Sequence, residues 1–229
     1  MKHLMWDIDG TLLLTGGAGI NAMKSVITVY YGLKNFEFDQ SLSGKTDCGI
    51  IRRAVLRVRK NFSAADVEAI MALYHKELPK FLPLYEGRLM KNVKKTLSYF
   101  AHSESYENCL LTGNTKTAAK LKLEHYGLDN FFSFSTNTFG ELSAERCDLA
   151  KEAWRHFGTV APKQRPEDYI FIGDTPNDIR CADAIGARCL ILLDGAKLKR
   201  EDFLQYHPWR ILDELPDDPY SLEKMFDEP

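Results

Sequence analysis

The chain has 229 residues, of which 45% are hydrophobic, and its formal net charge is −2. This length fits one α/β domain, or a core domain with a smaller inserted one, and the composition is sufficient for a buried core. A nearly neutral chain gives no reason to expect nucleic acid or an anionic membrane surface as a partner. Any bound phosphate must therefore be held by local charge.

The N-terminal segment does not have the character of a secretory signal, because Asp7 and Asp9 interrupt its apolar stretch. No apolar run approaches the roughly 20 residues that span a bilayer. The five cysteines are scattered and show no C-x-x-C spacing, so we interpret them as reduced thiols. These features predict a cytoplasmic protein without a membrane partner.

The first predicted element is a short buried strand over residues 3–6, which ends at the polar segment 7–11. Residues 17–32 have apolar side chains at helical spacing, and residues 47–60 and 64–80 predict two further helices. We find no good strand between residues 17 and 86, and this stretch is expected to be wholly helical.

After residue 86 the predicted strands and helices alternate. We expect helices over 88–101, 115–126, 146–157 and 176–185, and strands over 108–112, 131–135, 169–172 and 188–193. The acidic segment after residue 215 is expected to be a loosely packed end. Alternation of this kind favours an α/β fold with a doubly wound parallel sheet. We therefore predict a Rossmann-like core formed by residues 1–16 and 87–229, and a helical insertion over 17–86.

Ligands of such folds bind beyond the carboxyl ends of the strands, so the polar residues that follow the strands are the candidate site. Asp7 and Asp9 lie two residues apart at the end of the first strand and can project the same way. Gly10 permits a sharp turn, and Thr11 follows it. A plain polar turn is a poor explanation, because two adjacent acids at the end of an apolar strand repel each other.

This segment resembles the first motif, D-x-D-G-T, of the haloacid dehalogenase superfamily. The resemblance implies that Asp7 is a nucleophile that attacks phosphorus and that Asp9 is the general acid and base. It also places Gly10 and Thr11 at the substrate. The chemistry is reasonable, because an ionised carboxylate can form an acyl phosphate, and a second carboxyl in the same field can have its pKa raised towards neutrality.

Residues 112–114 form the second cluster, where a hydroxyl and free backbone N–H groups at a strand-to-helix turn can hold phosphate. The resemblance gives Thr112 the role of the family's second motif, with Gly113 and Asn114 beside the substrate. By itself Thr112 could simply begin a turn.

The family's third motif is a lysine at the start of a later helix, and this sequence departs from it. Arg146 is the nearest cation, and an arginine keeps its charge and can bind phosphate through two hydrogen bonds. Lys151 is the competing residue, and the alternative for Arg146 is a surface position on the helix.

The fourth cluster resembles the family signature G-D-x-x-x-D and contains Asp174 and Asp178. The resemblance implies that Mg²⁺ is bound by Asp7, the backbone carbonyl of Asp9 and Asp174, with Asp178 as a further acid near the metal. Oxygen ligands are what this cation requires. Asp178 also fits a helix capping box with Thr175.

A helical insertion directly after the first motif resembles the phosphoglycolate phosphatase-like branch, in which a helical cap closes over the site. Residues 43–47 resemble the loop that this branch points at its substrate, and Lys45 is expected to bind the organic part of the substrate. The alternative is a plain turn with Asp47 as the N-cap of the next helix. Four other side chains either reach the site or merely coat the cap: Tyr30, Tyr31, Arg52 and Arg53.

The ordered set of motifs predicts a Mg²⁺-dependent phosphatase that hydrolyses a small phosphorylated metabolite through an aspartyl phosphate. A phosphomutase similar to β-phosphoglucomutase and a catalytically weak, phosphate-binding regulatory protein are the alternatives. A phosphonate hydrolase would need a Schiff-base lysine in the cap, for which Lys45 is the candidate. Asp9 and Asp174 disfavour a dehalogenase, which needs no metal.

Overall fold

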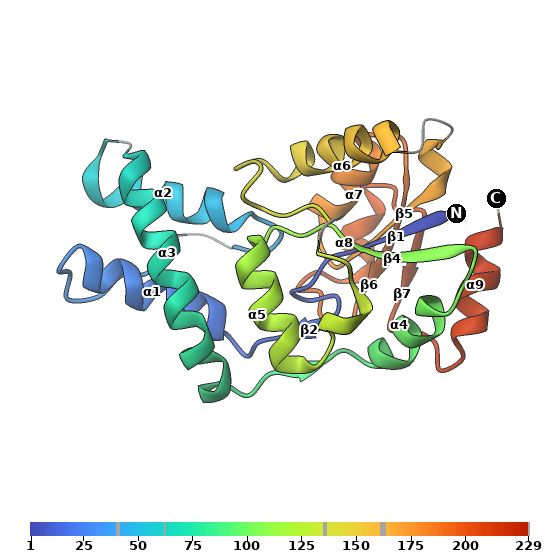
Figure 1. Ribbon diagram of the computed structural model, residues 1–229, viewed down its shortest axis with the longest axis horizontal. Coiled ribbons are helices and arrows are strands. Elements are labelled where there is room, and N and C mark those ends of the chain that lie inside the picture. Colours follow the sequence, from blue (N-terminus) through green and yellow to red (C-terminus); the bar gives the residue numbers. More distant parts are fainter. Residues whose placement is uncertain (40–41, 62, 135–136, 161–163, 229) are drawn as a thin grey trace.

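The computed structural model describes residues 1–39, 42–61, 63–134, 137–160 and 164–228. Figure 1 shows two parts, an α/β core and a group of three helices on one side of it, and both chain ends lie at the far side of the core from these helices. Among the described residues, none of the helices has the length and apolar character needed to cross a membrane.

The core is built on a five-stranded parallel sheet with the strand order β4-β1-β5-β6-β7. The strands are β1 (Lys2–Trp6), β4 (Tyr106–Leu110), β5 (Tyr169–Gly173), β6 (Arg188–Leu192) and β7 (Arg210–Leu212). In the register of the central strands, Leu4 of β1 lies between Asn108 of β4 and Ile170 of β5. Sheets of this kind are covered on both faces, which explains the nearly continuous apolar sequence of β1 and β5.

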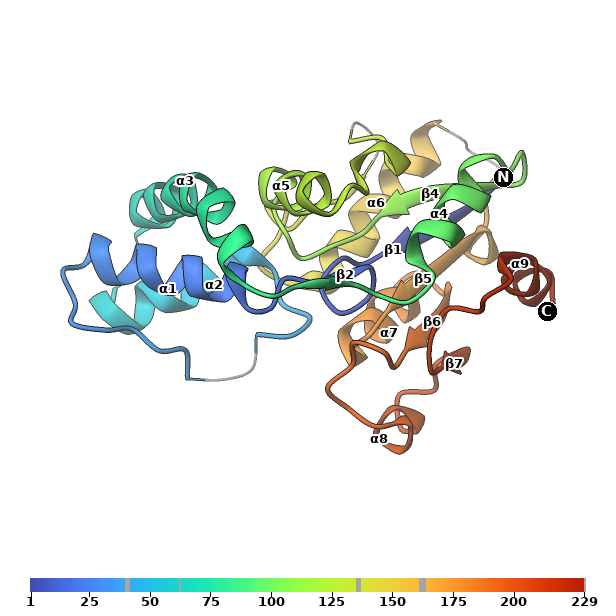
Figure 2. The same cartoon turned by 90° about the horizontal axis from the view of Figure 1, so that it is seen from below.

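Helices cover both faces of the sheet, as the two views in Figures 1 and 2 show. They are α4 (Val93–Ala101), α5 (Lys116–Tyr126), α6 (Arg146–Val160), α7 (Pro176–Asp183), α8 (Arg200–Leu204) and α9 (Pro219–Asp227). Side chains of α4, α5 and α9 belong to one buried cluster, and side chains of α6, α7 and α8 belong to another.

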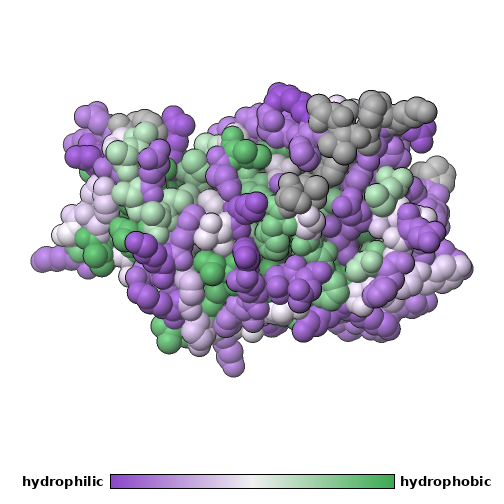
Figure 3. Space-filling model, viewed as in Figure 1, coloured by the Kyte–Doolittle hydropathy of each residue, from purple (hydrophilic) through white to green (hydrophobic). Residues whose placement is uncertain are grey.

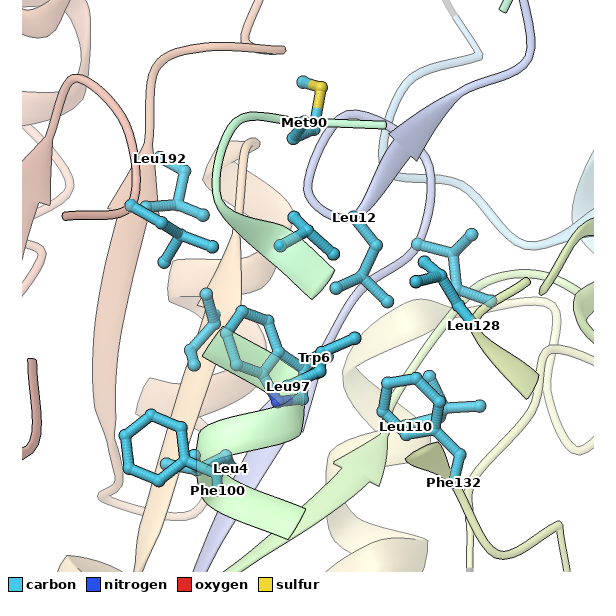
Figure 4. Close-up of a cluster of buried hydrophobic side chains, with 14 of the residues drawn as sticks. Leu4, Trp6, Leu12, Met90, Leu97, Phe100, Leu110, Leu128, Phe132 and Leu192 are labelled. Carbon is cyan, nitrogen blue, oxygen red and sulfur yellow. The ribbon is translucent and has the colours of Figure 1, made fainter. Parts of the chain in front are cut away.

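Successive side chains of β1 point to opposite faces of the sheet, so the strand contributes residues to both clusters. Leu4 and Trp6 point into the first cluster, where they pack against Leu97 and Phe100 of α4, as Figure 4 shows, whereas Met5 belongs to the second cluster. Strand residues that alternate between two covered faces are typical of a doubly wound sheet. The predicted fold class is therefore confirmed.

The helical insertion consists of α1 (Ala18–Tyr30), α2 (Asp47–Arg59) and α3 (Ala64–Phe81), which share a separate buried cluster. A short antiparallel ribbon of β2 (Leu13–Leu14) and β3 (Arg88–Leu89) carries the chain from the core to these helices and back. As expected, no strand is described between these two ribbon strands. The stretch is not wholly helical, however, because the described residues 31–39 and 42–46 between α1 and α2 form turns and irregular loops. The exact boundaries, 16/17 and 86/87, stay a prediction.

Three predictions of secondary structure are wrong in detail. Residues 131–134 form no strand, because Phe132 and Phe134 pack their rings against the first core cluster, while residue 135 lies outside the described part. The helix predicted from residue 88 begins at Val93, after β3 and after Asn92, whose φ of 61° interrupts the helix. The C-terminal segment is not loosely packed, since α9 buries Leu222 and Phe226 completely.

The face seen in Figure 3 is mainly polar. In the space-filling view of Figure 3, hydrophilic residues cover most of the visible face, and hydrophobic residues form patches among them. All five cysteines are free, in agreement with their interpretation as thiols.

Candidate active site

The predicted site residues meet at one edge of the sheet, because β4, β1 and β5 are adjacent and parallel. Asp7 directly follows β1, Asp174 directly follows β5, and Thr112 lies two residues beyond β4. The carboxyl ends of these strands therefore bring together three clusters that are far apart in the sequence.

Asp7, Asp174 and Asp178 form an acidic cluster, in which ligand oxygens of all three buried carboxylates lie within 4.8 Å of one another. Arg146, the first residue of α6, is buried beside them. Its Nη2 atom lies 3.0 Å from Oδ2 of Asp7 and 2.5 Å from Oδ1 of Asp178. The competing Lys151 is exposed and lies 3.5 Å from Asp148, so it is Arg146 that the fold brings to Asp7.

The charges of the acidic cluster do not balance. With all three carboxylates ionised, the one guanidinium leaves two negative charges uncompensated. Burial raises the pKa of Asp7, Arg146 lowers it, and Asp178 and Asp9 raise it, so that the pKa lies at about 6. Burial also raises the pKa of Asp174 well above its usual range. A bound divalent cation would compensate both charges, and carboxylate oxygens suit such an ion, so these residues fit a metal site.

Asp178 has two roles at once in this arrangement. Its Oδ2 atom accepts hydrogen bonds from the backbone N–H of Thr175 at 2.9 Å and from the Thr175 hydroxyl at 2.7 Å, which forms the capping box of α7. Its Oδ1 atom faces Arg146. The capping box thus orients Asp178 so that it holds the guanidinium against Asp7.

The turn after β1 requires glycine at position 10. Gly10 has a φ of 91°, and a Cβ atom there would lie 2.2 Å from Oδ2 of Asp174. Thr11 is completely buried, and its hydroxyl donates a hydrogen bond of 3.3 Å to Asp174. Gly10 and Thr11 therefore set the distance between the first and the fourth cluster.

Asp9 is held by two side chains from the other side of the site. Its Oδ2 atom accepts hydrogen bonds from Nδ2 of Asn114 at 2.7 Å and from Nζ of Lys122 at 2.6 Å. Lys122 also donates to Oδ1 of Asn114 at 2.6 Å. Sequence reasoning missed Lys122, although a signal exists, because this lysine falls on the buried face of α5 with Ala118 and Ala119.

Thr112 is completely buried, and its hydroxyl oxygen accepts hydrogen bonds from the backbone and the side chain of Asn114, at 3.3 and 2.9 Å. The proton of that hydroxyl is left to donate. Gly113 lies directly under the cap, because a Cβ atom there would come within 2.2 Å of the carbonyl oxygen of Lys45. Gly113 and Asn114 line the cavity described below, whereas Thr112 stands behind them.

The cap loop of residues 43–47 contacts the core through main-chain groups. Nδ2 of Asn177 donates to the carbonyl oxygen of Gly44 at 2.8 Å, and the backbone N–H of Asp47 donates to the carbonyl oxygen of Gly113 at 2.7 Å. Gly44 has a φ of 69°, and a Cβ atom there would lie 2.7 Å from the Thr175 hydroxyl. The loop therefore lies directly over the ends of β4 and β5.

The alternative interpretation of Asp47 as an N-cap is wrong. The N-cap of α2 is Thr46, whose hydroxyl accepts a hydrogen bond from the backbone N–H of Gly49 at 3.0 Å. Asp47 is the first helical residue, and its carboxylate accepts a hydrogen bond from the backbone N–H of Thr115 at 2.9 Å. Burial raises the pKa of Asp47 to about 6, although Lys122 opposes this rise.

A cavity of about 360 Å³ lies between the cap and the core. Asp7, Asp9 and Arg146 line it from the core, and Lys45 lines it from the cap loop. Burial and the nearby Arg53 lower the pKa of Lys45. The structure thus brings Lys45 to the same cavity as the catalytic candidates.

The other cap residues considered from the sequence lie elsewhere. The hydroxyls of Tyr30 and Tyr31 donate to Asp66 within the cap, at 3.2 and 2.8 Å. Arg52 and Arg53 line a second cavity of about 840 Å³, which shares Lys45 and Arg146 with the first. These four residues do not line the first cavity.

Comparison with known proteins agrees with this geometry. Residues 4–192 match the family model described as haloacid dehalogenase-like hydrolase. No curated protein matches the chain. Among solved structures, CbbY from Rhodobacter sphaeroides in complex with phosphate superimposes with a TM-score of 0.72 at 18% identity, covering 93% of this chain and 94% of that one.

Two further structures share the fold. A predicted phosphoglycolate phosphatase from Haemophilus somnus has a TM-score of 0.69 at 20% identity and covers 98% of this chain and 97% of its own. A CbbY mutant in complex with xylulose-(1,5)bisphosphate has a TM-score of 0.70 at 15% identity and covers 93% and 94% of the two chains. At such identities the likeness establishes the fold alone, and the family follows from the model that matches most of the chain.

Proposed function

The chain belongs to the haloacid dehalogenase-like hydrolase family, and from this premise we propose that it is a Mg²⁺-dependent phosphatase of small phosphomonoesters. The observation that carries the proposal is the position of Asp7. Its carboxylate lines the cavity, contacts Arg146 and belongs to an acidic cluster with two uncompensated charges. A nucleophile, a fixed cation and a site for a divalent cation are the parts that phosphoryl transfer needs.

In the proposed reaction, a carboxylate oxygen of Asp7 attacks phosphorus while the bond between phosphorus and the ester oxygen breaks. Asp9, which lines the same cavity, gives its proton to the leaving alkoxide. Asp9 then takes a proton from water, and the resulting hydroxide attacks the aspartyl phosphate. Inorganic phosphate leaves, and Asp7 is regenerated as a carboxylate.

The remaining residues hold the charges in place. Asp7, Asp174 and the backbone carbonyl of Asp9 are the proposed Mg²⁺ ligands, with Asp178 behind them. When bound, the ion offsets the repulsion between the attacking carboxylate and the phosphate dianion. Arg146 stabilises the equatorial phosphoryl oxygens, and Gly113, which lines the cavity, offers a backbone N–H as a further donor. Thr112 and Asn114 are proposed to hold this segment in position, since they bond to each other and Asn114 also bonds to Asp9.

The organic part of the substrate is proposed to lie under the cap, against Lys45. CbbY, which shares the fold, has been crystallised with phosphate and with a sugar bisphosphate, which supports a small phosphorylated metabolite as the substrate. The cytoplasmic location stays a prediction from the sequence.

The test is phosphate release from p-nitrophenyl phosphate and from a panel of small phosphorylated metabolites, with Mg²⁺ and with EDTA. We expect release that depends on Mg²⁺ and that falls about 10³-fold or more in Asp7→Asn, which removes the nucleophile's charge. Near-normal activity of this variant, or full activity in EDTA, would exclude the mechanism. Isomerisation of a sugar phosphate without net release would favour a phosphomutase, and no turnover of any compound would favour a regulatory protein.

A further inference from the structure

The cap places one unusual side chain over the cavity. Tyr74 lies on α3, its side chain is completely buried, and it lines the 360 Å³ cavity. Its hydroxyl has no hydrogen-bond partner among the described residues. Buried polar groups are normally paired, so an unpaired hydroxyl on a side chain that lines a cavity indicates a partner that enters from outside.

The neighbouring polar groups of the site are already engaged. Lys122 donates to Asp9 and to Asn114, and the Asp47 carboxylate accepts from the Thr115 backbone. Burial and the charges of Asp47 and Asp9 raise the pKa of Tyr74 well above its usual value. The hydroxyl therefore keeps its proton and remains a hydrogen-bond donor.

The space beside this hydroxyl is bounded by a glycine. A Cβ atom at Gly19 of α1 would lie 3.5 Å from the Tyr74 hydroxyl and 3.6 Å from Nζ of Lys122. Both distances are ordinary van der Waals contacts, so the two donors and Gly19 surround one small volume at the cavity wall. This volume has room for one carbon atom and receives no side chain from Gly19, and the cavity lining continues to the apolar Ile20 and Met23.

We propose that this volume is a leaving-group subsite, in which the Tyr74 hydroxyl donates a hydrogen bond to an oxygen of the organic part of the substrate. Lys122 provides the positive wall of the same subsite. The preferred substrates are then aliphatic phosphomonoesters with a hydroxyl or carbonyl oxygen on the carbons near the ester, and unsubstituted alkyl phosphates bind less well. The subsite deepens the proposed phosphatase function and rests on it.

The test measures binding, so that it does not depend on turnover. Isothermal titration calorimetry measures the dissociation constant of each compound for the Asp7→Asn chain in the presence of Mg²⁺. Each of the three pairs compares an oxygenated compound with an alkyl phosphate of the same chain length: 2-hydroxyethyl with ethyl phosphate, glycerol 3-phosphate with n-propyl phosphate, and ribitol 5-phosphate with n-pentyl phosphate. We expect at least one oxygenated member to bind about tenfold more tightly than its alkyl match, as one well-placed hydrogen bond allows.

Adding Tyr74→Phe should reduce this preference to less than about threefold and leave the affinity for the alkyl member unchanged. Tyr30→Phe is the control, because it removes a cap hydroxyl that donates to Asp66 and does not line the cavity. This variant should still bind the oxygenated member more tightly than the alkyl member. Gly19→Ala places a methyl group in the subsite and should weaken the oxygenated member while leaving ethyl phosphate unaffected. This variant also covers the case in which Tyr74→Phe fails to fold.

Two outcomes would overturn the subsite: no pair shows a preference, or the preference survives both Tyr74→Phe and Gly19→Ala. Phosphate release by the wild-type chain, measured in parallel on the same compounds, separates the two proposals. Release without any oxygen preference would remove the subsite and keep the phosphatase. A preference that depends on Tyr74, without release, would keep the subsite and remove the phosphatase.

Discussion

The floor and the roof of the cavity differ in how their polar groups are satisfied. On the floor, which the core provides, Asp7 and Asp178 share Arg146, and Asp9 is held by Lys122. On the roof, which the cap provides, the Tyr74 hydroxyl has no partner among the described residues. The polar groups of the floor are thus already paired before any ligand binds, whereas the roof has a hydrogen-bond donor that is still unpaired.

This difference suggests that the floor and the roof have different roles in the reaction. Groups that are fixed in advance around the position of a developing charge need no reorganisation during the reaction, and they suit the phosphoryl group, which every substrate carries. A buried donor without a partner gains its hydrogen bond only when a suitable ligand binds, so it discriminates between substrates. The core would then determine the chemistry, and the cap would determine the choice of substrate.

Among the variants that compare floor and roof, removal of the floor's fixed cation should have the largest effect. Arg146→Ala should lower kcat/KM by roughly 150-fold or more, which corresponds to about 3 kcal/mol of lost transition-state stabilisation. Arg146→Lys keeps a cation of the type that the family uses here and should retain most of the activity. Lys151→Ala is the matched control, since this exposed lysine lies on the same helix and should change little.

Steady-state kinetics on p-nitrophenyl phosphate with Mg²⁺ measures these effects, and thermal unfolding confirms that each variant is folded. A large loss in Lys151→Ala together with a small loss in Arg146→Ala would show that the third motif had been assigned to the wrong residue.

Asp47 lies where the roof meets the floor, and its raised pKa predicts a pH-dependent stability. Between pH 4 and pH 6 the folded chain keeps a proton on Asp47 that the unfolded chain has lost, so the contribution of Asp47 to stability falls as the pH rises through this window and is constant above it. Asp47→Asn carries no charge, so its stability relative to wild type should rise by about 2 kcal/mol between pH 4.5 and pH 7.5.

Urea unfolding of both proteins at the two pH values in EDTA measures this difference. The same difference in unfolding free energy at both pH values would mean that Lys122 fully compensates the Asp47 charge in the folded chain.

Substitution of Lys45, in the cap loop, tests whether the roof recognises the organic part of the substrate. Lys45→Ala should lower kcat/KM for the best metabolite by 10- to 100-fold, about 1.4 to 2.7 kcal/mol, and should change p-nitrophenyl phosphate by less than about threefold. The reason is that Lys45 lines the cavity from the cap, against which the organic part of the substrate is proposed to lie. Equal losses on both substrates would instead assign Lys45 to the phosphoryl group or to a Schiff base.

The contrast between floor and roof also explains what could be predicted from the sequence. Asp7, Asp9, Thr112 and Asp174 stand at strand ends in short local motifs, and parallel strands bring such ends together by topology alone. The alternating pattern after residue 86 likewise predicted the sheet, because each strand and each helix carries its own periodicity.

Lys122 and Tyr74 could not be assigned in the same way, because their roles depend on tertiary packing. Lys122 meets Asp9 through the packing of α5 on the core, and Tyr74 reaches the cavity only because α3 lies across it. The wrong strand at 131–135 has a related cause, since aromatic side chains favour strands but equally fill gaps in a core. The helix α9 was missed although Asp218 and Pro219 are helix-start signals.

The smallest expected effect is that of Tyr74→Phe on the free energy of unfolding, and it checks directly whether the Tyr74 hydroxyl of the roof is unpaired. Tyr74→Phe removes a buried hydroxyl without a partner, so the free energy of unfolding of the ligand-free chain should stay the same or rise by up to about 1 kcal/mol. Tyr31→Phe is the matched control in the same cap, because its hydroxyl donates a hydrogen bond of 2.8 Å to the ionised Asp66, and its loss should cost about 1.5 kcal/mol. Urea unfolding of both variants at pH 7.5 gives the two values. A cost in Tyr74→Phe as large as that in Tyr31→Phe would mean that the Tyr74 hydroxyl is already satisfied in the free protein, and the cap would then hold no donor in reserve for the substrate.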